Sequence, residues 1–313
     1  MSRRLLLGVH LPVMGIGDYE FKREQILSSA RLAEELGFDS LSVNDHISYR
    51  THWLDSLETL AAVAAVTDRI RIATSILNVV ARNPVVSLKA LSSIDILSSG
   101  RLIAGIGPGS HKGDYLAAGV PFEERWGRFR ESTEILSRFW GRDSIEYRGR
   151  FYQLEDIPVT PRPIQRPHPP LMVGSWGSEQ ILRMIARFGD GWMASAYNIT
   201  PDDLKGKSDL LLSYREESGL GEAGFEVSVM TMFCYIASDK EKALGMVRER
   251  LAPALGRPAE ELEKALPFGS SEECVERLQK LSEAGAHRIH LWPIGDYAEQ
   301  LEILAKEVVP TFE

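Results

Sequence analysis

The fold class is decided by residues 70–106, which read IRIATSILNVVARNPVVSLKALSSIDILSSGRLIAGI. The run Ile70–Leu77 is short and apolar, and it predicts a buried strand. Pro84 opens the helical pattern Val85–Leu97, and Leu102–Ile106 predicts the next strand. Consecutive strands with a helix between them pair in parallel through a right-handed crossover. This stretch therefore predicts one unit of a parallel α/β sheet.

The same alternation continues in both directions and gives eight strand–helix units. Eight such units close into a (β/α)8 barrel more readily than they form an open sheet. We therefore predict the α/β class, with residues 1–313 forming a single TIM-barrel domain. The proline-rich stretch Gly141–Pro170 breaks the pattern before the fifth strand and predicts a hairpin-containing insertion. The expected strands are Leu5–His10, Ser40–Asn44, Ile70–Leu77, Leu102–Ile106, Leu171–Val173, Gly191–Ser195, Phe225–Ile236 and Arg288–Trp292, and the expected helices are Phe21–Leu36, Leu57–Val66, Val85–Leu97, Phe122–Trp140, Glu179–Phe188, Asp202–Ser218, Glu241–Leu251 and Ser271–Ala284, before a last helical pattern of Tyr297, Leu301, Leu304 and Val308.

Composition and charge disfavour several classes of protein. The 313 residues are 44% hydrophobic and 26% charged, as in ordinary globular proteins. With 36 basic and 44 acidic residues the formal net charge is −8, which disfavours binding to nucleic acid or to an anionic membrane surface. No apolar run reaches the ~18 residues that span a membrane, and Leu5–Val9 is too short for the core of an export signal. We expect a cytoplasmic protein with a small-molecule substrate and no nucleic-acid or membrane partner.

Four histidines lie where a barrel carries its chemistry, at the C-terminal ends of strands and in the loops after them. His10, His46 and His290 lie at the ends of the first, second and eighth strands, and His111 lies in the loop after the fourth. Three of these histidines, His10, His46 and His290, could supply metal ligands together with Asp45, so a metal-dependent hydrolase is one alternative. The first strand lacks the His-x-His pair that is usual for such barrels. We therefore expect no metal site.

Two loops with several glycines are candidate ligand sites. Gly174-Ser175-Trp176-Gly177-Ser178 joins the fifth strand to a helix that begins near Glu179, which suits either an anion site or an ordinary N-cap by Ser178. Gly105-Ile106-Gly107-Pro108-Gly109 does not match the dinucleotide fingerprint, because Ser110 occupies its last glycine position. No helix is expected directly after it, since 110–121 is loop-like. This pattern favours a flexible barrel loop near a ligand.

Motifs spread along nearly the whole chain resemble those of the bacterial-luciferase-like superfamily of barrel oxidoreductases. The likeness is greatest to the branch that depends on coenzyme F420, a deazaflavin. The motifs are Ala33–Ser40 with Asn44-Asp45-His46, Thr74–Leu77 with Arg82–Val86, Gly105–Gly109 with Asp114-Tyr115 and Gly119–Arg125, Tyr147–Tyr152 with Pro161-Arg162-Pro163, Gln165–Pro170, and Gly174 with Gly189–Trp192.

This resemblance implies a tricyclic cofactor in the barrel mouth. Its phosphate would lie against the loop after the fifth strand, which places Gly174, Ser175, Gly177 and Ser178 in the cofactor site. The resemblance also implies a cis peptide between Ser75 and Ile76 that presses on the central ring. The loop with Gly107 and Gly109 would pass close to the cofactor.

His46 corresponds to the histidine that transfers a proton in relatives that oxidise alcohols with F420. An imidazole with a pKa near 6.5 can take up and release a proton near neutral pH. We therefore predict His46 as the catalytic residue, and His10, Ser110 and His111 as residues of the substrate pocket. Ser110 is a departure, because sugar-oxidising relatives carry an acidic residue there and many other members carry tryptophan.

The leading prediction is an F420-dependent oxidoreductase that moves a hydride between the cofactor and a small organic substrate. The alternatives are an FMN-dependent monooxygenase of the same fold and a flavin-binding barrel without catalytic activity. The resemblance also implies a homodimer, for which the apolar helix surface Ala61–Val66 is a candidate interface.

Overall fold

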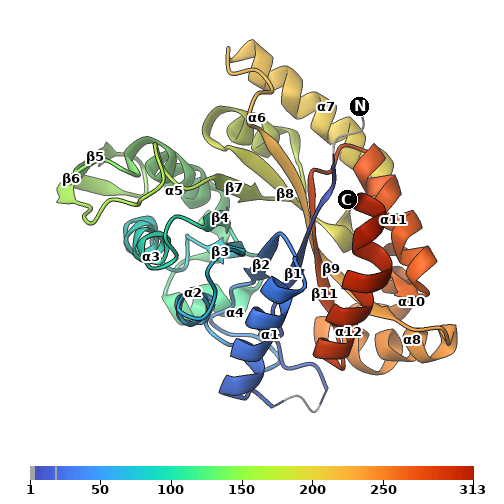
Figure 1. Ribbon diagram of the computed structural model, residues 1–313. Coiled ribbons are helices and arrows are strands. Elements are labelled where there is room, and N and C mark those ends of the chain that lie inside the picture. The colour runs from blue at the N-terminus through green and yellow to red at the C-terminus, as the bar shows by residue number, and fades with distance from the viewer. Residues whose placement is uncertain (1–3, 18–19) are drawn as a thin grey trace.

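The computed structural model describes residues 4–17 and 20–313 and shows a closed barrel of eight parallel strands (Figure 1). Each barrel strand pairs in parallel with the next one along the chain, and the ring closes through the pairing of the last strand with the first. The predicted (β/α)8 barrel is therefore confirmed. The barrel strands are β1 (Leu6–His10), β2 (Ser40–Val43), β3 (Arg71–Asn78), β4 (Leu102–Gly107), β7 (Leu171–Gly174), β8 (Gly191–Ser195), β9 (Glu226–Ile236) and β11 (Arg288–Pro293).

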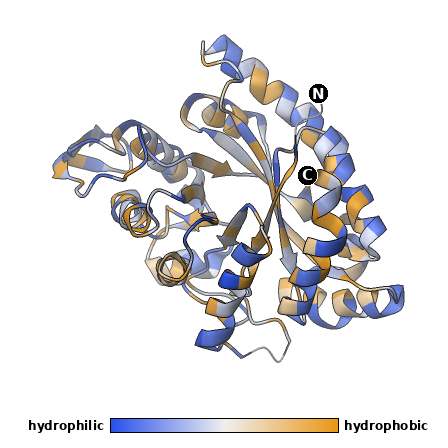
Figure 2. Cartoon of the chain, in the orientation of Figure 1, coloured by the Kyte–Doolittle hydropathy of each residue, from blue (hydrophilic) through white to orange (hydrophobic). Residues whose placement is uncertain are grey.

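Helices surround the barrel, and both polar and apolar residues alternate along them (Figure 2). This pattern is expected of helices that pack one face on the strands. No helix in residues 4–17 and 20–313 is both long and apolar enough to cross a membrane. The helices are α1 (Arg23–Glu35), α2 (Ser56–Ala64), α3 (Pro84–Leu97), α4 (Lys112–Ala118), α5 (Arg125–Phe139), α6 (Glu179–Phe188), α7 (Pro201–Glu217), α8 (Lys240–Met246), α9 (Ala252–Leu255), α10 (Ala259–Ala265), α11 (Ser271–Glu283) and α12 (Tyr297–Ile303).

The structure differs from the sequence prediction in two segments. The stretch 110–121, expected to be a loop, contains α4, which ends at Gly119 in the left-handed conformation (φ 67°) that glycine adopts at helix ends. The region after the predicted helix Glu241–Leu251 holds α9, α10 and a two-residue strand, β10 (Phe268–Gly269), which pairs with β9. Both segments consist of short elements whose patterns are too brief to recognise in the sequence.

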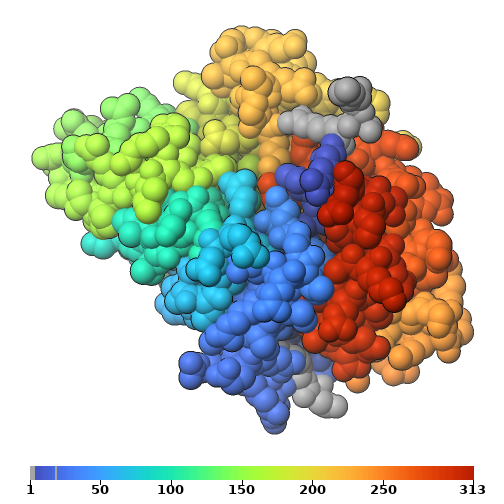
Figure 3. All heavy atoms as spheres, viewed as in Figure 1, coloured from blue at the N-terminus to red at the C-terminus, as the bar shows by residue number. Residues whose placement is uncertain are grey.

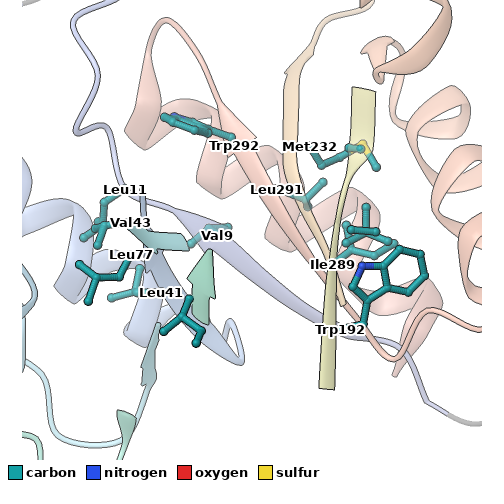
Figure 4. Close-up of a cluster of buried hydrophobic side chains, with 14 of the residues drawn as sticks. Val9, Leu11, Leu41, Val43, Leu77, Trp192, Met232, Ile289, Leu291 and Trp292 are labelled. Carbon is teal, nitrogen blue, oxygen red and sulfur yellow. The ribbon is translucent and has the colours of Figure 1, made fainter. Parts of the chain in front are cut away.

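The core consists of two layers. The larger lies between the strands and the helices, and close-packed side chains such as Val9, Leu41 and Trp192 belong to it (Figure 4). The smaller lies inside the barrel, where Ile103, Met172, Met193 and Met230 pack with Ala73 and Ile76. Strand residues alternate between the two layers because successive side chains point to opposite faces. The barrel is thus filled rather than hollow below its mouth.

The predicted insertion is also present. β5 (Ser144–Arg148) and β6 (Gln153–Pro158) form an antiparallel hairpin that projects to the side of the barrel (Figures 1 and 3). Its turn is held by Glu131 of α5, whose carboxylate accepts the backbone N–H groups of Arg150, Phe151 and Tyr152 at 2.8–3.2 Å. The N-terminal and C-terminal segments lie side by side on the face shown in Figure 3, where α1 contacts α12.

Candidate functional site

A cavity of about 240 Å³ opens at the C-terminal ends of the barrel strands. Its walls come from the C-terminal ends of β2, β3, β7 and β8, from the middle of β9, from the loop after β4, and from the start of α5. This is the end of a TIM barrel where active sites lie. The lining residues are Asn44, Asp45, His46, Ser75, Ile76, Pro108, Gly109, Ser110, Phe122, Arg125, Trp126, Gly174, Ser175, Trp176, Met193, Ala194, Ser195, Tyr197, Met230 and Thr231.

Most of the residues predicted from the sequence meet at this cavity. His46, Ser75, Ile76, Gly109, Ser110, Gly174 and Ser175 line it. Five others do not line it, namely His10, Gly107, His111, Gly177 and Ser178. Their surroundings show what each of them contacts instead.

His46 follows β2 and is held from one side by a carboxylate. Its Nδ1 lies 2.9 Å from Oδ2 of Asp114, a residue of α4 that is 1% exposed. The aromatic rings of Tyr49 and Trp53 pack against the imidazole, with centroids 4.3 and 4.6 Å away. Nε2 makes no hydrogen bond within the part of the chain that the structure describes. The ring therefore has one nitrogen anchored and the other available for proton transfer.

Asp45 has a structural environment although it follows β2 next to His46. Both of its carboxylate oxygens bind Arg82, at 2.8 and 2.7 Å, and they also accept the Ser56 hydroxyl and the Asn78 backbone N–H at 3.0 Å. Burial opposes the charge of Arg82, but the carboxylates of Asp45 and Asp55 raise its pKa above the usual arginine value. Asp45 thus ties the loop after β2 to β3 and α2.

The predicted cis peptide between Ser75 and Ile76 is present at the end of β3. The register of β3 against β4 shifts between Thr74 and Leu77, and the side chain of Ile76 turns toward the barrel axis. Two glycines make room for it. A Cβ at Gly107 would lie 2.7 Å from Cδ1 of Ile76, and one at Gly174 would lie 2.4 Å from its Cγ2. Gly107 therefore packs below Ile76 rather than lining the cavity.

The loop after β7 leads into the N-terminus of α6. Ser178 is the N-cap residue, but its hydroxyl makes no capping hydrogen bond, and Gly177 has a positive φ of 74°. Nζ of Lys207 lies 3.2 Å from the carbonyl oxygen of Trp176 and so lies beside this turn. The first N–H groups of a helix have no partner inside the helix. Such an end, with a lysine beside it, can bind an anion.

His10 is fully buried behind the cavity. Its Nδ1 lies 2.8 Å from the carbonyl oxygen of Leu11, its Nε2 lies 2.5 Å from the side-chain amide of Asn44, and its ring stacks on Trp292 at 3.4 Å. Burial lowers the pKa of His10 from 6.5 to about 3, so the ring is neutral at physiological pH. Asn44, which lines the cavity, links His10 to the site.

His111 is the residue before α4 and lies at the edge of the His46 cluster. Its ring centroid is 6.0 Å from that of His46 and 5.1 Å from that of Tyr49. Burial raises the pKa of Tyr49, which keeps its hydroxyl protonated.

Several lining residues were not singled out from the sequence. Arg125 lines the cavity, and its Cζ lies 3.9 Å from the centroid of the Phe122 ring. Among the described residues, no other lysine or arginine lines this cavity. Ser195 and Thr231 also line the cavity, and their hydroxyls are 3.0 Å apart. Thr231 has a φ of 58°, which is rare for a β-branched residue. The register shift of β9 at this point produces it, and a single sequence gives no sign of such a bulge.

The side chains that could have formed a metal site lie apart. Asp45 binds Arg82, His46 binds Asp114, His10 stacks on Trp292, and His290 lies 3.0 Å from the Ser40 hydroxyl inside the barrel. Across 4–17 and 20–313, no three His, Cys, Asp or Glu residues are grouped to hold a metal ion.

Comparison with known proteins agrees with the barrel fold. A family model described as luciferase-like monooxygenase matches residues 9–288. The uncharacterized protein Rv0953c of Mycobacterium tuberculosis is 31% identical over 196 residues, which are 56% of this chain and 69% of that protein. The F420-dependent glucose-6-phosphate dehydrogenase of Intrasporangium calvum is 26% identical over 324 residues, with 93% of this chain and 95% of that enzyme covered.

Solved structures share the fold over the full length. Monooxygenase RslO1 from Streptomyces bottropensis has a TM-score of 0.87 and 24% identity, and the match covers 99% of this chain and 100% of the other. An F420-dependent secondary alcohol dehydrogenase in complex with an F420–acetone adduct has a TM-score of 0.86 and 18% identity, with 99% of both chains covered. At these identities the likeness shows the fold alone.

Proposed function

Because the chain belongs to the luciferase-like monooxygenase family of oxidoreductases, we propose that it is an F420-dependent oxidoreductase, which moves a hydride between the deazaflavin and a small organic substrate. The observation that carries this proposal is the placement of His46, which lines the cavity with Nδ1 bound to Asp114. The likeness over nearly the full length to an F420-dependent dehydrogenase supports the choice of cofactor.

The cavity fits a flat aromatic group that has polar edges. Ile76, Met193 and Met230 form an apolar floor, since all three also belong to the apolar layer inside the barrel. Asn44 and Ser75 line the same cavity and offer an amide and a hydroxyl. Sites for aromatic cofactors combine apolar walls with a few such polar groups.

An anionic group of the cofactor also finds suitable residues. The uncapped N-terminus of α6, with Gly177, Ser178 and the nearby Lys207, suits a phosphate. Arg125 places a cation on the cavity wall. Asp45 also lines the cavity, but the charge of its carboxylate is compensated by Arg82. The charge balance of the cavity therefore favours an anionic ligand.

F420, when bound, supplies a ring carbon that can accept or release a hydride. The residues of the chain supply the matching proton transfer. A substrate oxidised at a carbon that bears a hydroxyl would lose a hydride, with its two electrons, from that carbon. The hydroxyl proton passes to Nε2 of His46, and the carbon–oxygen bond becomes a carbonyl. A positioned histidine contributes roughly 10²–10⁴-fold to such a step.

Ser110 is the cavity residue that bears most directly on the class of substrate. It lines the cavity at the position where the sequence resemblance places an acidic residue in sugar-oxidising relatives. A hydroxyl cannot take over the proton chemistry of a carboxylate near neutral pH. The proposal is therefore limited to a small organic substrate and does not extend to glucose 6-phosphate. The cytoplasmic location expected from the sequence stays a prediction.

The deciding experiment is equilibrium binding of F420 and of FMN to the purified protein, measured side by side by isothermal titration calorimetry. Micromolar or tighter binding of F420 with no detectable FMN binding supports the proposal. Tight FMN binding without F420 binding overturns it in favour of an FMN-dependent monooxygenase. Turnover is then followed by the visible absorbance of F420 with a panel of alcohols, and binding without turnover of any of them favours a non-catalytic flavin-binding barrel.

A further inference from the structure

The carboxylate of Asp114 is held more firmly than its contact with His46 alone would require. Its Oδ1 accepts the backbone N–H groups of Ile47 and Ser48 at 2.9 and 2.8 Å, while Oδ2 faces Nδ1 of His46 at 2.9 Å. The side chain is 1% exposed. A buried carboxylate with these three contacts has one orientation. Asp114 of α4 therefore binds the backbone next to His46 and the His46 ring at the same time.

This geometry determines which nitrogen of His46 carries the proton. An ionised carboxylate only accepts hydrogen bonds, so Nδ1 must be the protonated nitrogen of the neutral ring. Nε2 then keeps its lone pair. We infer that Asp114 is a positioning residue, which fixes His46 as the Nδ1–H tautomer and thereby makes Nε2 the proton acceptor on the cavity side. The tautomer of His46 follows from these contacts, and only the transfer of a substrate proton to Nε2 rests on the proposed function.

Asp114 also stabilises the ring after it has taken up the proton. A carboxylate in contact with an imidazole favours the charged imidazolium. The other groups that face His46 carry no compensating charge of this kind. Tyr49 has its pKa raised by burial and stays neutral, and Trp53 is not ionisable.

Two further titratable groups lie near the ring without binding it. His111 approaches it edge-on with a centroid distance of 6.0 Å, and the carboxylate of Asp45 is bound by Arg82. Burial raises the pKa of Tyr49, and the cations Arg50 and Arg257 oppose this effect. Asp114 is thus the carboxylate that bonds directly to His46.

The test uses the tautomer itself as its readout and needs no cofactor. Protein labelled with ¹⁵N at histidine gives the protonated nitrogen and the pKa of each ring by NMR, and His46→Gln identifies the signal of His46. The wild type is expected to show His46 as the Nδ1–H tautomer. In Asp114→Asn the amide can donate to Nδ1, so the ring is expected to change to the Nε2–H tautomer.

Asp95→Asn is a matched control. Asp95 is fully buried and accepts the backbone N–H groups of Ile164 and Gln165 at 2.7 and 3.0 Å, but it lies against no histidine. The control should leave the His46 signal unchanged. An Nε2–H tautomer in the wild type, or an unchanged Nδ1–H tautomer in Asp114→Asn, overturns the inference. The wild-type measurement decides the question even if Asp114→Asn does not fold.

Kinetics separate a positioning role from a merely structural one. In Asp114→Asn, F420 binding should stay within threefold of wild type, while kcat falls about 100-fold and the acidic limb of the pH–rate profile moves to lower pH. Equal losses of F420 affinity and of kcat would indicate general damage to the site and contradict the inference. If the wild type does not bind F420, the proposed function fails, but the NMR result still decides the role of Asp114.

Discussion

Because His10 is buried, we predict that the free energy of unfolding of this protein depends on pH. Its pKa is about 3 in the folded protein because burial disfavours the imidazolium, against 6.5 for a solvated imidazole. Between these two values the unfolded chain binds a proton that the folded protein does not bind. Stability therefore falls as the pH falls, and this contribution is fully present above pH 6.5 and lost progressively toward pH 3.

The size of the effect follows from the two pKa values. Between pH 7.5 and pH 5, a histidine whose pKa drops from 6.5 to about 3 on folding reduces the free energy of unfolding by about 2 kcal/mol. The complete loss, which is reached below pH 3, is about 5 kcal/mol. The window above pH 5 is chosen because ordinary carboxylates titrate mostly below it. His290 is also fully buried, with its pKa lowered, and adds an effect of the same sign.

The assay is urea unfolding at pH 7.5 and at pH 5, followed by tryptophan fluorescence, for wild type and for His10→Gln. The variant can be less stable than wild type at both pH values. The decrease in its free energy of unfolding from pH 7.5 to pH 5 should be about 2 kcal/mol smaller than the decrease in wild type. His52→Gln is the control, because this exposed side chain has similar surroundings in the folded and unfolded states. A loss in His10→Gln equal to that in wild type would refute the reasoning.

Three other predictions concern the site and the assembly. His46→Ala should keep F420 binding and lose roughly 10²–10⁴-fold in turnover; a loss of only a few-fold, measured by steady-state kinetics, would make His46 a wall residue. Gly177→Val should weaken F420 binding at least tenfold (~1.4 kcal/mol) in a calorimetric titration, because a Cβ there would lie 3.1 Å from the Trp192 ring. The control is Gly219→Val, which has a similar φ of 73° but no atom within 4 Å of the added Cβ, and it should leave F420 binding unchanged. Light scattering at micromolar concentration should show the homodimer expected from the sequence, and a monomeric wild type would contradict this prediction. Val86→Glu should abolish the dimer, since Val86 is 62% exposed on α3, which packs beside the Ala61–Val66 surface.

The barrel could be predicted because its strands are buried on both faces. Runs such as Leu102–Ile106 contain no charged residue, and each is followed by a helical pattern and a glycine or proline boundary. Because the strands of the barrel are parallel, their C-terminal ends meet at one rim. Residues as distant in sequence as His46 and Ser175 therefore line one cavity. Position along the chain was sufficient to find this part of the site.

Side-chain direction and short elements could not be predicted in this way. His10 and His46 both lie at strand ends, yet one is buried against Trp292 and the other lines the cavity. The helix that carries Asp114 has seven residues, too few for stability from local propensity. It is held by tertiary contacts, since Tyr115 is 1% exposed and Asp114 bonds to the loop after β2. No local pattern encodes such contacts.

The arrangement around His10 explains why a neutral histidine is useful beside the cavity. Its ring stacks on Trp292 at 3.4 Å, and Trp292 in turn stacks on Phe233 at 4.2 Å. These rings close the β11 side of the barrel mouth, and Trp292 also lines a second cavity of about 450 Å³ beyond them. Asn44, which lies against Nε2 of His10, lines the first cavity. Burial disfavours a charged imidazole in this stack, so His10 stays uncharged, and the residue proposed for proton transfer is His46.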